Sequence, residues 1–452
     1  MTTSARLAAV RNNGGSEWSL SAAGARWRSA IVAGISATLM MSAIAFGGTT
    51  DWAVLGLRTA SVLLLAAWMM LQWSTGAVTV QRNAAYVACL AFALAIGVQL
   101  VSGSSVYRYI TGNEAAGYCA YAILFFVASE VLGNERLTRF MRSVAIFGAA
   151  LAFFAILQKL SGTQKIYWLY APQFGGQAIF GPYTNRNHYC GLMEMLWPFA
   201  LLLGIREGGV RRGLLLGAAG VMLASVFLSG SRGGAASCAV QILIAGIFIA
   251  GQRRGRRTAT MIWGVALLLM VAGGALWLGS PATLARLINT DGAQRTLIYR
   301  DTLRMWLERP WLGFGWGTFP VAYPRFRSFY SVFFINQTHN DYLQVLVECG
   351  IAGFGCAAAF IALTLRQGIS AVRRFGLYDA VGAGRVAAML GIAGILVHSL
   401  VDFNLHIPAN AALFAVLCGV ASRPSDRSRQ RWRRTQKTKE EPVGATMPAS
   451  AY

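Results

Sequence analysis

The chain is organised around two stretches, QRTLIYRDTLRMWLERPWLGFGWGTF at residues 294–319 and THNDYLQVLVECGIAGFG at residues 338–355. The first stretch lies in a long segment at about 280–340 that separates two strongly apolar parts of the sequence. The second stretch begins at the end of this segment and continues into the apolar helix that follows it. The segment contains arginines at positions 286, 295, 300, 304, 309, 325 and 327. Such a concentration of charge in an apolar chain indicates where its chemistry takes place.

The composition indicates a membrane protein. Of the 452 residues, 56% are hydrophobic and only 13% are charged, and the mean hydropathy is +0.50. A soluble protein with this composition would have more apolar surface than it could bury. The net charge of +23 is typical of a polytopic protein that follows the positive-inside rule, and it does not indicate a nucleic-acid partner. The seven cysteines fall in apolar segments, so we expect neither a disulfide framework nor a metal cluster.

Twelve apolar segments are long enough to cross a hydrocarbon core about 30 Å thick. The sequence therefore predicts an all-α polytopic integral membrane protein. The approximate limits of the predicted spans are 29–48, 52–71, 84–101, 115–132, 143–160, 188–205, 213–229, 233–251, 260–279, 341–364, 383–402 and 405–421.

The joints between these spans alternate in charge, and this alternation predicts the topology. Most of the lysines and arginines fall in every second joint and in the two ends of the chain, so these parts are expected in the cytoplasm. We predict a cytoplasmic N-terminal segment at 1–28, a transmembrane domain at 29–421 with a periplasmic loop at 280–340, and a basic, disordered cytoplasmic tail at 422–452. The tail is expected to contact anionic membrane lipids, in preference to nucleic acid. Ala43-Ile44-Ala45 resembles a signal-peptidase site, but the apolar run is longer than that of a signal peptide, so we expect the first span to be retained.

The joints predicted on the outer side are unusual because they are also basic. Positive charge on the translocated side opposes the topological bias. All four histidines of the chain map to this side as well: His188 and His339 open spans, and His398 and His406 flank a short joint. Asp402 lies in that joint. Histidines and arginines gathered on one face of a membrane protein indicate a functional site.

Two short motifs accompany the long loop. GPYTNRNH at 181–188 ends an aromatic joint and starts a helix, and SGSRGG at 229–234 turns the chain within about four residues. So tight a turn leaves Arg232 at the membrane surface among small residues, where a ligand can approach closely. Arg232 by itself could equally be an interfacial arginine whose head reaches water. Arg295, Arg300 and His339 are predicted on the same side of the membrane. Their presence near Arg232 favours an anion-binding site.

The long loop contains a predicted amphipathic helix at 294–308, ended by Pro310. Arg300 and Arg304 share one of its faces, whereas Leu297, Leu303 and Trp306 suit an apolar side facing the membrane interface. The glycines at 313, 315 and 317 predict a flexible turn and not a nucleotide-binding loop, because no strand precedes them and no Lys-Ser/Thr follows. Thr338 is the predicted N-cap of the next span, which would place His339 in its first turn.

These motifs, in this order and spacing, resemble the O-antigen ligase and polymerase superfamily of bacterial envelope glycosyltransferases. The resemblance rests on GPYTNRNH, SGSRG, RTLIYRDTL, PWLGFGWGTF, THNDYLQ, ECGIAG and HSLVDFNLHIPANA, and it covers residues of about 180–420. The motifs do not separate ligases from polymerases.

The resemblance implies a GT-C-like enzyme of the bacterial inner membrane with its active site facing the periplasm. The donor would be a glycan linked to undecaprenyl diphosphate, and the acceptor a hydroxyl of the lipid A core in a ligase or of another glycan in a polymerase. The family's catalytic residues correspond to Arg232, Arg295 and His339. The candidate substrate-binding residues are Arg186, Arg300, His188, Asn340, Asp341 and Asp402.

The chemistry of these residue types agrees with that role. Guanidinium groups stabilise a departing diphosphate through always-charged, bidentate hydrogen bonds. A histidine can accept the proton of an acceptor hydroxyl, and a single attack from the opposite face would invert the anomeric carbon. The acidic residues predicted on the outer side lack the paired carboxylates of a metal-dependent transferase, so we expect neither a metal nor a cofactor. A transporter of lipid-linked polysaccharide is the alternative of another class, although the sequence lacks the internal repeats common in transporters.

Overall fold

The computed structural model describes residues 3–76, 78–133, 135–172, 179–250, 291–332 and 334–424. Their regular elements are helices: α1 (Thr3–Ile44), η1 (Phe46–Gly48), α2 (Asp51–Ser74), α3 (Ala85–Ser102), α4 (Arg108–Val131), α5 (Glu135–Leu160), α6 (Arg186–Arg206), α7 (Gly209–Ser229), α8 (Arg232–Ala250), α11 (Asp291–Glu308), α12 (Phe319–Ala322), η2 (Tyr323–Arg325), α13 (Asp341–Phe375), α14 (Ala380–His398), η3 (Asn404–His406) and α15 (Pro408–Ser422).

The protein is an all-α polytopic membrane protein. Ten helices in the described part of the chain are long and apolar enough to span a bilayer, and α15 is a shorter apolar helix. Every predicted span coincides with one of these helices except 260–279, which lies outside the described residues. The predicted tail, 422–452, lies outside them from residue 425 onward.

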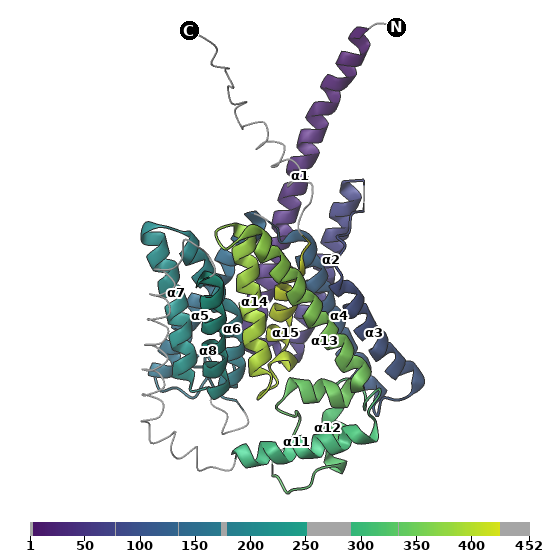
Figure 1. Cartoon of the computed structure of the whole chain (residues 1–452), viewed down its shortest axis with the longest axis vertical. Coiled ribbons are helices and arrows are strands. Elements are labelled where there is room, and N and C mark those ends of the chain that lie inside the picture. Colours follow the sequence, from purple (N-terminus) through teal and green to yellow (C-terminus); the bar gives the residue numbers. More distant parts are fainter. Residues whose placement is uncertain are drawn as a thin grey trace, which may run out of the picture.

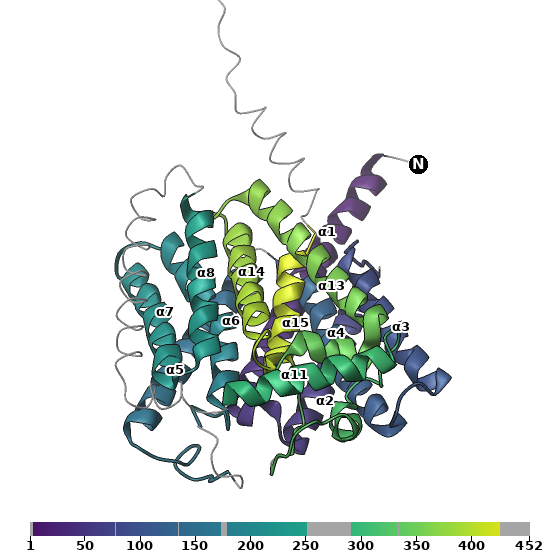
Figure 2. The same cartoon turned by 60° about the horizontal axis from the view of Figure 1, so that its bottom comes forward.

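The helices form a bundle with α11 and α12 across one end (Figure 1). The N-terminus of α1 projects from the opposite end, and α11 runs crosswise to the long helices above it (Figures 1 and 2). We call the end that carries α11 the loop end. Both long motifs that organise the sequence therefore lie at the loop end.

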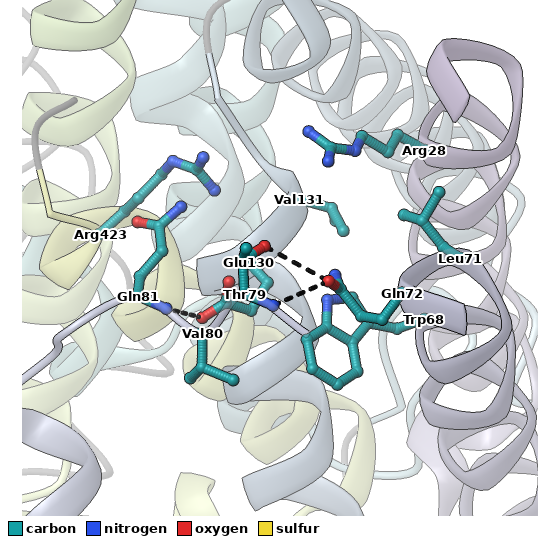
Figure 3. A pocket seen from close by; sticks show the side chains of 10 residues that line it. All are labelled: Arg28, Trp68, Leu71, Gln72, Thr79, Val80, Gln81, Glu130, Val131 and Arg423. Atoms are coloured by element: carbon teal, nitrogen blue, oxygen red, sulfur yellow. Dashed lines mark hydrogen bonds between the residues drawn. The ribbon is translucent and has the colours of Figure 1, made fainter. Parts of the chain in front are cut away.

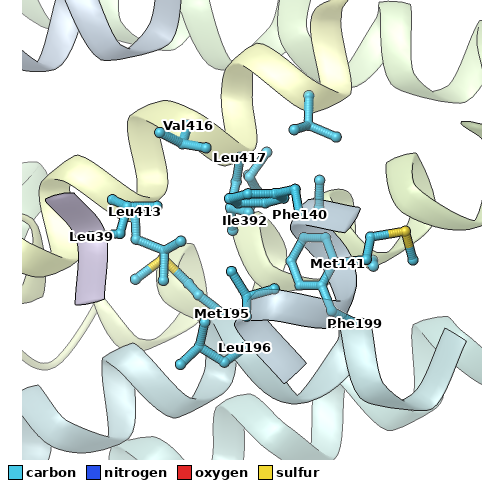
Figure 4. Packing of buried hydrophobic residues seen from close by; sticks show 14 of the residues in the cluster. Leu39, Phe140, Met141, Met195, Leu196, Phe199, Ile392, Leu413, Val416 and Leu417 are labelled. Atoms are coloured by element: carbon cyan, nitrogen blue, oxygen red, sulfur yellow. The ribbon is translucent and has the colours of Figure 1, made fainter. Parts of the chain in front are cut away.

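Among the long apolar helices that the structure describes, α6 and α14 are the most buried. The apolar window of α6 is 94% buried and that of α14 is 72% buried, whereas the windows of the peripheral α2 and α3 are each 28% buried. Figure 4 shows side chains of α6 packed against those of α5, α14 and α15. Gln241 of α8 is fully buried and donates hydrogen bonds to the carbonyl oxygens of Glu194 and Leu390, which joins α8 to both of these helices. The loop ends of α6 and α14 are thus held in a fixed relation.

The helix predicted in the long loop is present, but its packing differs from the prediction. α11 buries Ile298, Thr302 and Met305, which lie on one face at helical spacing, whereas Leu303 is 42% exposed. The buried face packs on a small apolar core with Phe314, Phe319 and Val347, so the protein itself covers this face of the helix.

Glycines shape the connection from α11 to α13. Gly313, Gly315 and Gly317 all have positive φ angles of 68°, 113° and 78°, which other residues rarely adopt. The buried carboxylate of Glu348 accepts hydrogen bonds from the backbone N–H groups of Gly317 and Phe319 at 2.8 and 3.1 Å. The predicted flexible turn is in fact a defined turn anchored on α13.

α13 is kinked at Gly350, where φ is 63°. The backbone N–H of Ile351 donates to the carbonyl oxygen of Pro310 at 2.8 Å, so the chain after α11 enters the kink. A Cβ atom on Gly350 would overlap the backbone of Trp311. The kink thus fixes the loop against the first turns of α13, which begin shortly after His339.

At the end opposite α11, a polar cavity of about 200 Å³ lies between α1, α2, α4 and α15. Figure 3 shows Arg28 and Arg423 on two sides of it, with Glu130 between them. The Glu130 carboxylate accepts hydrogen bonds from the backbone N–H of Gln81 and the hydroxyl of Tyr86. This cavity and the histidines thus lie at opposite ends of the bundle.

Candidate active site

The carboxylate of Asp402 lies at the centre of the predicted outer residues. It follows α14 and is 1% exposed. Its Oδ1 atom lies 3.8 Å from Nε2 of His188 and 4.0 Å from Nδ1 of His339, and its Oδ2 atom lies 4.0 Å from Nε2 of His398. Three of the four histidines thus surround one buried acid at the loop end.

The histidines come from three different helical ends. His188 lies in the first turn of α6, which Asn185 caps by accepting a hydrogen bond from the backbone N–H of Asn187. His398 is the last residue of α14, and its Nδ1 atom lies 2.8 Å from Oε1 of Glu194 in α6. His339 immediately precedes the capping residue of α13. The two most buried helices, α6 and α14, therefore help to position the site.

The N-cap prediction for α13 was wrong by two residues. Asn340 is the cap, because its side-chain oxygen accepts hydrogen bonds from the N–H groups of Tyr342 and Leu343. Thr338 donates to the carbonyl oxygen of Asn340 at 2.7 Å and accepts from its N–H, which closes a tight turn around His339. His339 consequently lies outside the helix with φ of 57°, a conformation that costs free energy in a non-glycine residue.

Neighbours hold His339 in this strained conformation. The hydroxyl of Tyr299 in α11 donates to its carbonyl oxygen at 2.9 Å. Phe403 lies between the rings of His339 and His188, with centroid distances of 5.1 and 4.7 Å. Asn340 also donates from its amide to the carbonyl oxygen of Leu400 at 2.9 Å, so the turn is fixed from both sides.

Asp341 connects this turn to the joint after α14. Its carboxylate is 4% exposed and accepts hydrogen bonds from the hydroxyl of Ser399 at 2.6 Å and the N–H of Leu405 at 3.2 Å. The other oxygen lies 2.8 Å from Nδ1 of His406. Through these contacts the carboxylate of Asp341 can hold the imidazole of His406 and the joint after α14 in place.

Arg295 reaches the same joint from α11. Its Nη1 atom donates to the carbonyl oxygen of Val401 at 2.7 Å, next to Asp402. Its positive charge also acts on the imidazole of His339. The long loop therefore places an arginine beside the histidine cluster.

The electrostatics of the cluster favour a neutral His339 beside an ionised Asp402. Burial lowers the pKa of His339 to about 4, and the charge of Arg295 acts in the same direction. Burial alone would raise the pKa of Asp402, but polar interaction with His188 and the charges of His188 and His398 hold that pKa below its ordinary value. A neutral imidazole near neutral pH is the form that can accept a proton.

The small residues around Arg232 allow the turn before α8 to touch the cluster. Arg232 is exposed at the start of α8. A Cβ atom on Gly233 would lie 2.6 Å from Cδ2 of His398, and one on Gly234 would lie 2.8 Å from Cβ of Cys190. A larger residue at either position would therefore overlap His398 or Cys190 and disturb the packing of the start of α8.

Two further arginines, Arg186 and Arg300, were predicted to bind substrate. Arg186 starts α6, two residues before His188, whereas Arg300 is exposed on α11. Arg304, Arg309 and Arg325 make contacts within the loop or to its surroundings: Arg304 lies 3.9 Å from Asp301, Arg309 donates to the carbonyl oxygen of Ser104, and Arg325 pairs with Glu308.

Comparison with known families agrees with this geometry. The family model described as O-antigen ligase matches residues 217–358. Over these residues the chain is similar to the O-antigen ligase family. No curated protein matches the sequence.

The part matched to O-antigen ligase runs from the middle of α7 to the middle of α13. It contains Arg232, Arg295 and His339. His188 and Asp402 lie outside it and meet His339 only in the folded structure. The cluster therefore combines the family segment with the ends of α6 and α14.

Glu194 was missed in the sequence. It is fully buried in α6, and one of its carboxylate oxygens contacts His398. An acidic residue inside an apolar span is costly and usually functional, so its position in the predicted span 188–205 was a usable signal. Tyr299 gave no comparable signal, because a tyrosine on an amphipathic helix is ordinary.

No group of three or more histidine, cysteine, aspartate or glutamate side chains in the described residues is arranged to hold a metal ion. In the cluster, Nδ1 of His339, Nε2 of His188 and one oxygen each of Glu194 and Asp402 are buried without a hydrogen-bond partner. Buried polar atoms of this kind need an explanation, and a polar substrate bound beside them supplies one.

Proposed function

We propose that this protein transfers a glycan from undecaprenyl diphosphate to an acceptor hydroxyl at the periplasmic face of the bacterial inner membrane. The observation that carries the proposal is the placement of Arg295 and a neutral His339, whose side chain is 31% exposed, beside the buried Asp402 at the loop end. The match of residues 217–358 to the O-antigen ligase family model supports the class of reaction.

In the proposed mechanism His339 is the general base. Asp402 lies on the Nδ1 side of the ring, which favours a proton on Nδ1 and leaves the lone pair of Nε2 free to accept the hydroxyl proton. The acceptor oxygen forms a bond to the anomeric carbon while the bond from that carbon to the diphosphate oxygen breaks. Asp402 stabilises the imidazolium that results.

The diphosphate leaves with the bonding electron pair, and its negative charge is stabilised by Arg232 and Arg295. Arg186 and Arg300 are proposed to bind the donor less directly. Arginine suits this role because its guanidinium stays charged and can make two parallel hydrogen bonds to phosphate. A single displacement of this kind inverts the anomeric carbon and requires no metal or cofactor.

The ligase reaction, with lipid A core as acceptor, is the proposed form, and polymerisation of lipid-linked glycans is its close alternative. Purified protein in detergent, supplied with a lipid-linked glycan and an acceptor, should release undecaprenyl diphosphate and retain this activity in EDTA. A protein that only moves lipid-linked glycan across a membrane would release none, which would refute an enzymatic function. Restoration by magnesium of an activity lost in EDTA would refute the proposed role of the arginines.

A further inference from the structure

A second cavity at the loop end is not used by the mechanism above. It has a volume of about 370 Å³ and lies between α2, α4, the start of α15 and the glycine-rich turn. This volume is within the range of about 300–1,000 Å³ that is typical of small-ligand pockets. Its lining residues Leu405 and His406 belong to the joint that also carries Asp402, so the cavity and the histidine cluster share this joint.

The walls of the cavity combine aromatic rings with carboxylates. Trp316 of the glycine-rich turn and Tyr121 of α4 supply rings, and Asp51 and Glu114 supply carboxylates. The Trp316 ring lies 5.9 Å from the imidazole of His406 at an interplanar angle of 33°. Aromatic walls with a few polar groups are suited to sugar rings, whose hydroxyls donate to carboxylates.

The charge of the cavity argues against a phosphate ligand. Two carboxylates line the cavity together with one guanidinium, that of Arg58, and the imidazole of His406, which already contacts the Asp341 carboxylate at 2.8 Å. Both terminal nitrogens of Arg58 donate to Asn113, at 2.8 and 2.9 Å. A diphosphate would be repelled here, whereas the arginines proposed to bind the donor lie on α8 and α11. A hydroxyl-rich ligand that is neutral or carries an amine fits the cavity better.

His406 connects the cavity to the site. Its Nδ1 atom lies 2.8 Å from Asp341, while its Nε2 atom is buried without a hydrogen-bond partner. A sugar hydroxyl in the cavity would satisfy that nitrogen. The same Asp341 directly follows Asn340 and so fixes the turn that carries His339, which gives the cavity a structural link to the proposed base.

The cavity is also accessible from the lipid-facing side of the bundle. Leu55 lines it and is 66% exposed, and the neighbouring Trp52 of α2 is 61% exposed. Exposed apolar residues on a spanning helix face lipid. A ligand with its sugar at the membrane surface and its chain in the bilayer could therefore enter between lipid and protein.

We propose that this cavity is a subsite for a sugar of the lipid-anchored acceptor glycan, with Trp316 and Tyr121 as its walls and Asp51, Glu114 and His406 as its hydrogen-bonding groups. The proposal rests on the transfer reaction proposed above. It places the acceptor glycan beside α2 and α4 and the donor diphosphate beside α8 and α11, on opposite sides of the joint that carries Asp402.

The test uses two glycine substitutions in one helix. Gly117 lines the cavity, and a Cβ atom on it would lie 3.6 Å from the Arg58 guanidinium, its nearest neighbour, so Gly117→Leu should fill the cavity without a backbone clash. Gly112 in the same helix has open space around it and does not line the cavity, so Gly112→Leu is the matched control. Glu114→Gln removes one carboxylate, with Glu308→Gln in the loop as its control.

The full-length protein in nanodiscs is assayed with rough lipopolysaccharide and with glycan-bearing undecaprenyl diphosphate as acceptors. Glu114→Gln should raise the KM for the acceptor that the wild type uses by about tenfold, the effect of losing a hydrogen bond to a charged group. Gly117→Leu should raise this KM by about tenfold or more, because its side chain occupies the space of the sugar. The KM for the donor should change less than about twofold, and both controls should match the wild type.

Binding of the two acceptors and of sugar-free undecaprenyl phosphate is measured on the same samples. Equal binding of the sugar-bearing acceptors by wild type and Gly117→Leu would overturn the subsite, whether or not the enzyme turns over. Equal weakening of the sugar-free lipid would show that the cavity holds a lipid chain and would overturn it too. Loss of the proposed function is recognised separately, because the wild type would then release no undecaprenyl diphosphate.

Discussion

At the scale of single residues, the imidazole of His339 and the guanidinium of Arg295 have different proposed tasks although they lie on one loop. His339 has a strained backbone, a buried Nδ1 atom and a lowered pKa. Arg295 contacts the backbone of the Asp402 joint and points a permanent charge at the same place. Substitutions can therefore separate proton transfer from donor binding.

His339→Ala should leave the binding of lipid-linked donor intact and lower the transfer rate by about 10² to 10⁴, the usual contribution of a positioned general base. Arg295→Ala should weaken donor binding as well as turnover, because it removes a charge-assisted contact. Lysine at this position should restore only part of the loss. Donor affinity and transfer rate are measured on the same folded variants. Wild-type turnover in His339→Ala would make His188, His398 or His406 the next candidate base.

The lowered pKa of His339 predicts the pH dependence. Because that pKa is about 4, the imidazole is neutral and able to accept a proton at neutral pH, and kcat/KM should fall only as the pH decreases through about 4. Arg295→Met removes a positive charge that lowers the pKa, so the acidic limb of the remaining activity should move upward, toward the ordinary value of 6.5. A wild-type limb near 6.5 would contradict this interpretation of the site.

At the scale of secondary-structure elements, the kink in α13 connects the glycine-rich turn to the candidate active-site residues. The backbone of Pro310 and Trp311 occupies the kink at Gly350, and the buried Glu348 holds the N–H groups of the turn. Asn340 and Asp341 lie at the start of the same helix. A change in the kink should therefore be transmitted to His339.

Gly350→Ala should destabilise the protein and reduce transfer, because alanine disfavours the φ of 63° and its Cβ would overlap Trp311. The expected cost is at least about 2 kcal/mol. Gly355→Ala in the same helix is the control, since its Cβ would have no neighbour within 4 Å. The thermal unfolding midpoint in detergent should fall for Gly350→Ala and stay the same or rise for Gly355→Ala. Equal midpoints would contradict the structural role of the kink.

At the scale of the whole molecule, the bundle separates two polar ends. The loop end carries α11 (Figure 1), the histidine cluster and the cavity between α2 and α4. The cavity lined by Arg28 and Arg423 (Figure 3) lies between α1, α2, α4 and α15 at the other end. The charge alternation along the sequence predicts that the loop end faces the periplasm. The orientation can be tested without any assay of activity.

Tyr330 in the long loop is 85% exposed, and Gly208 in the joint between α6 and α7 is exposed with open space around it. A cysteine at Tyr330 should react with an impermeant thiol reagent in cells with a permeabilised outer membrane. A cysteine at Gly208 should react only after the inner membrane is disrupted. The wild type, with its own seven cysteines, gives the background. The opposite labelling pattern would reverse the topology and remove the proposed periplasmic site.

The sequence by itself determined the class of the protein, the extents of its helices and the identities of the proposed catalytic residues. These features depend on local properties: the length of an apolar run, the charge of a joint and the order of short motifs. Even Glu194 carried a local signal, because an acid within an apolar span is unusual.

Only the tertiary structure decided which side chains meet. His188, His339, His398 and Asp402 come from distant parts of the sequence, and the packing of α6 and α14 brings them together. The same packing decided that Asn340 and not Thr338 caps α13, and that α11 buries Ile298 and Met305 against the protein. Periodicity identifies a helix but not the partner for each face, because that partner is chosen by the free energy of packing the whole bundle.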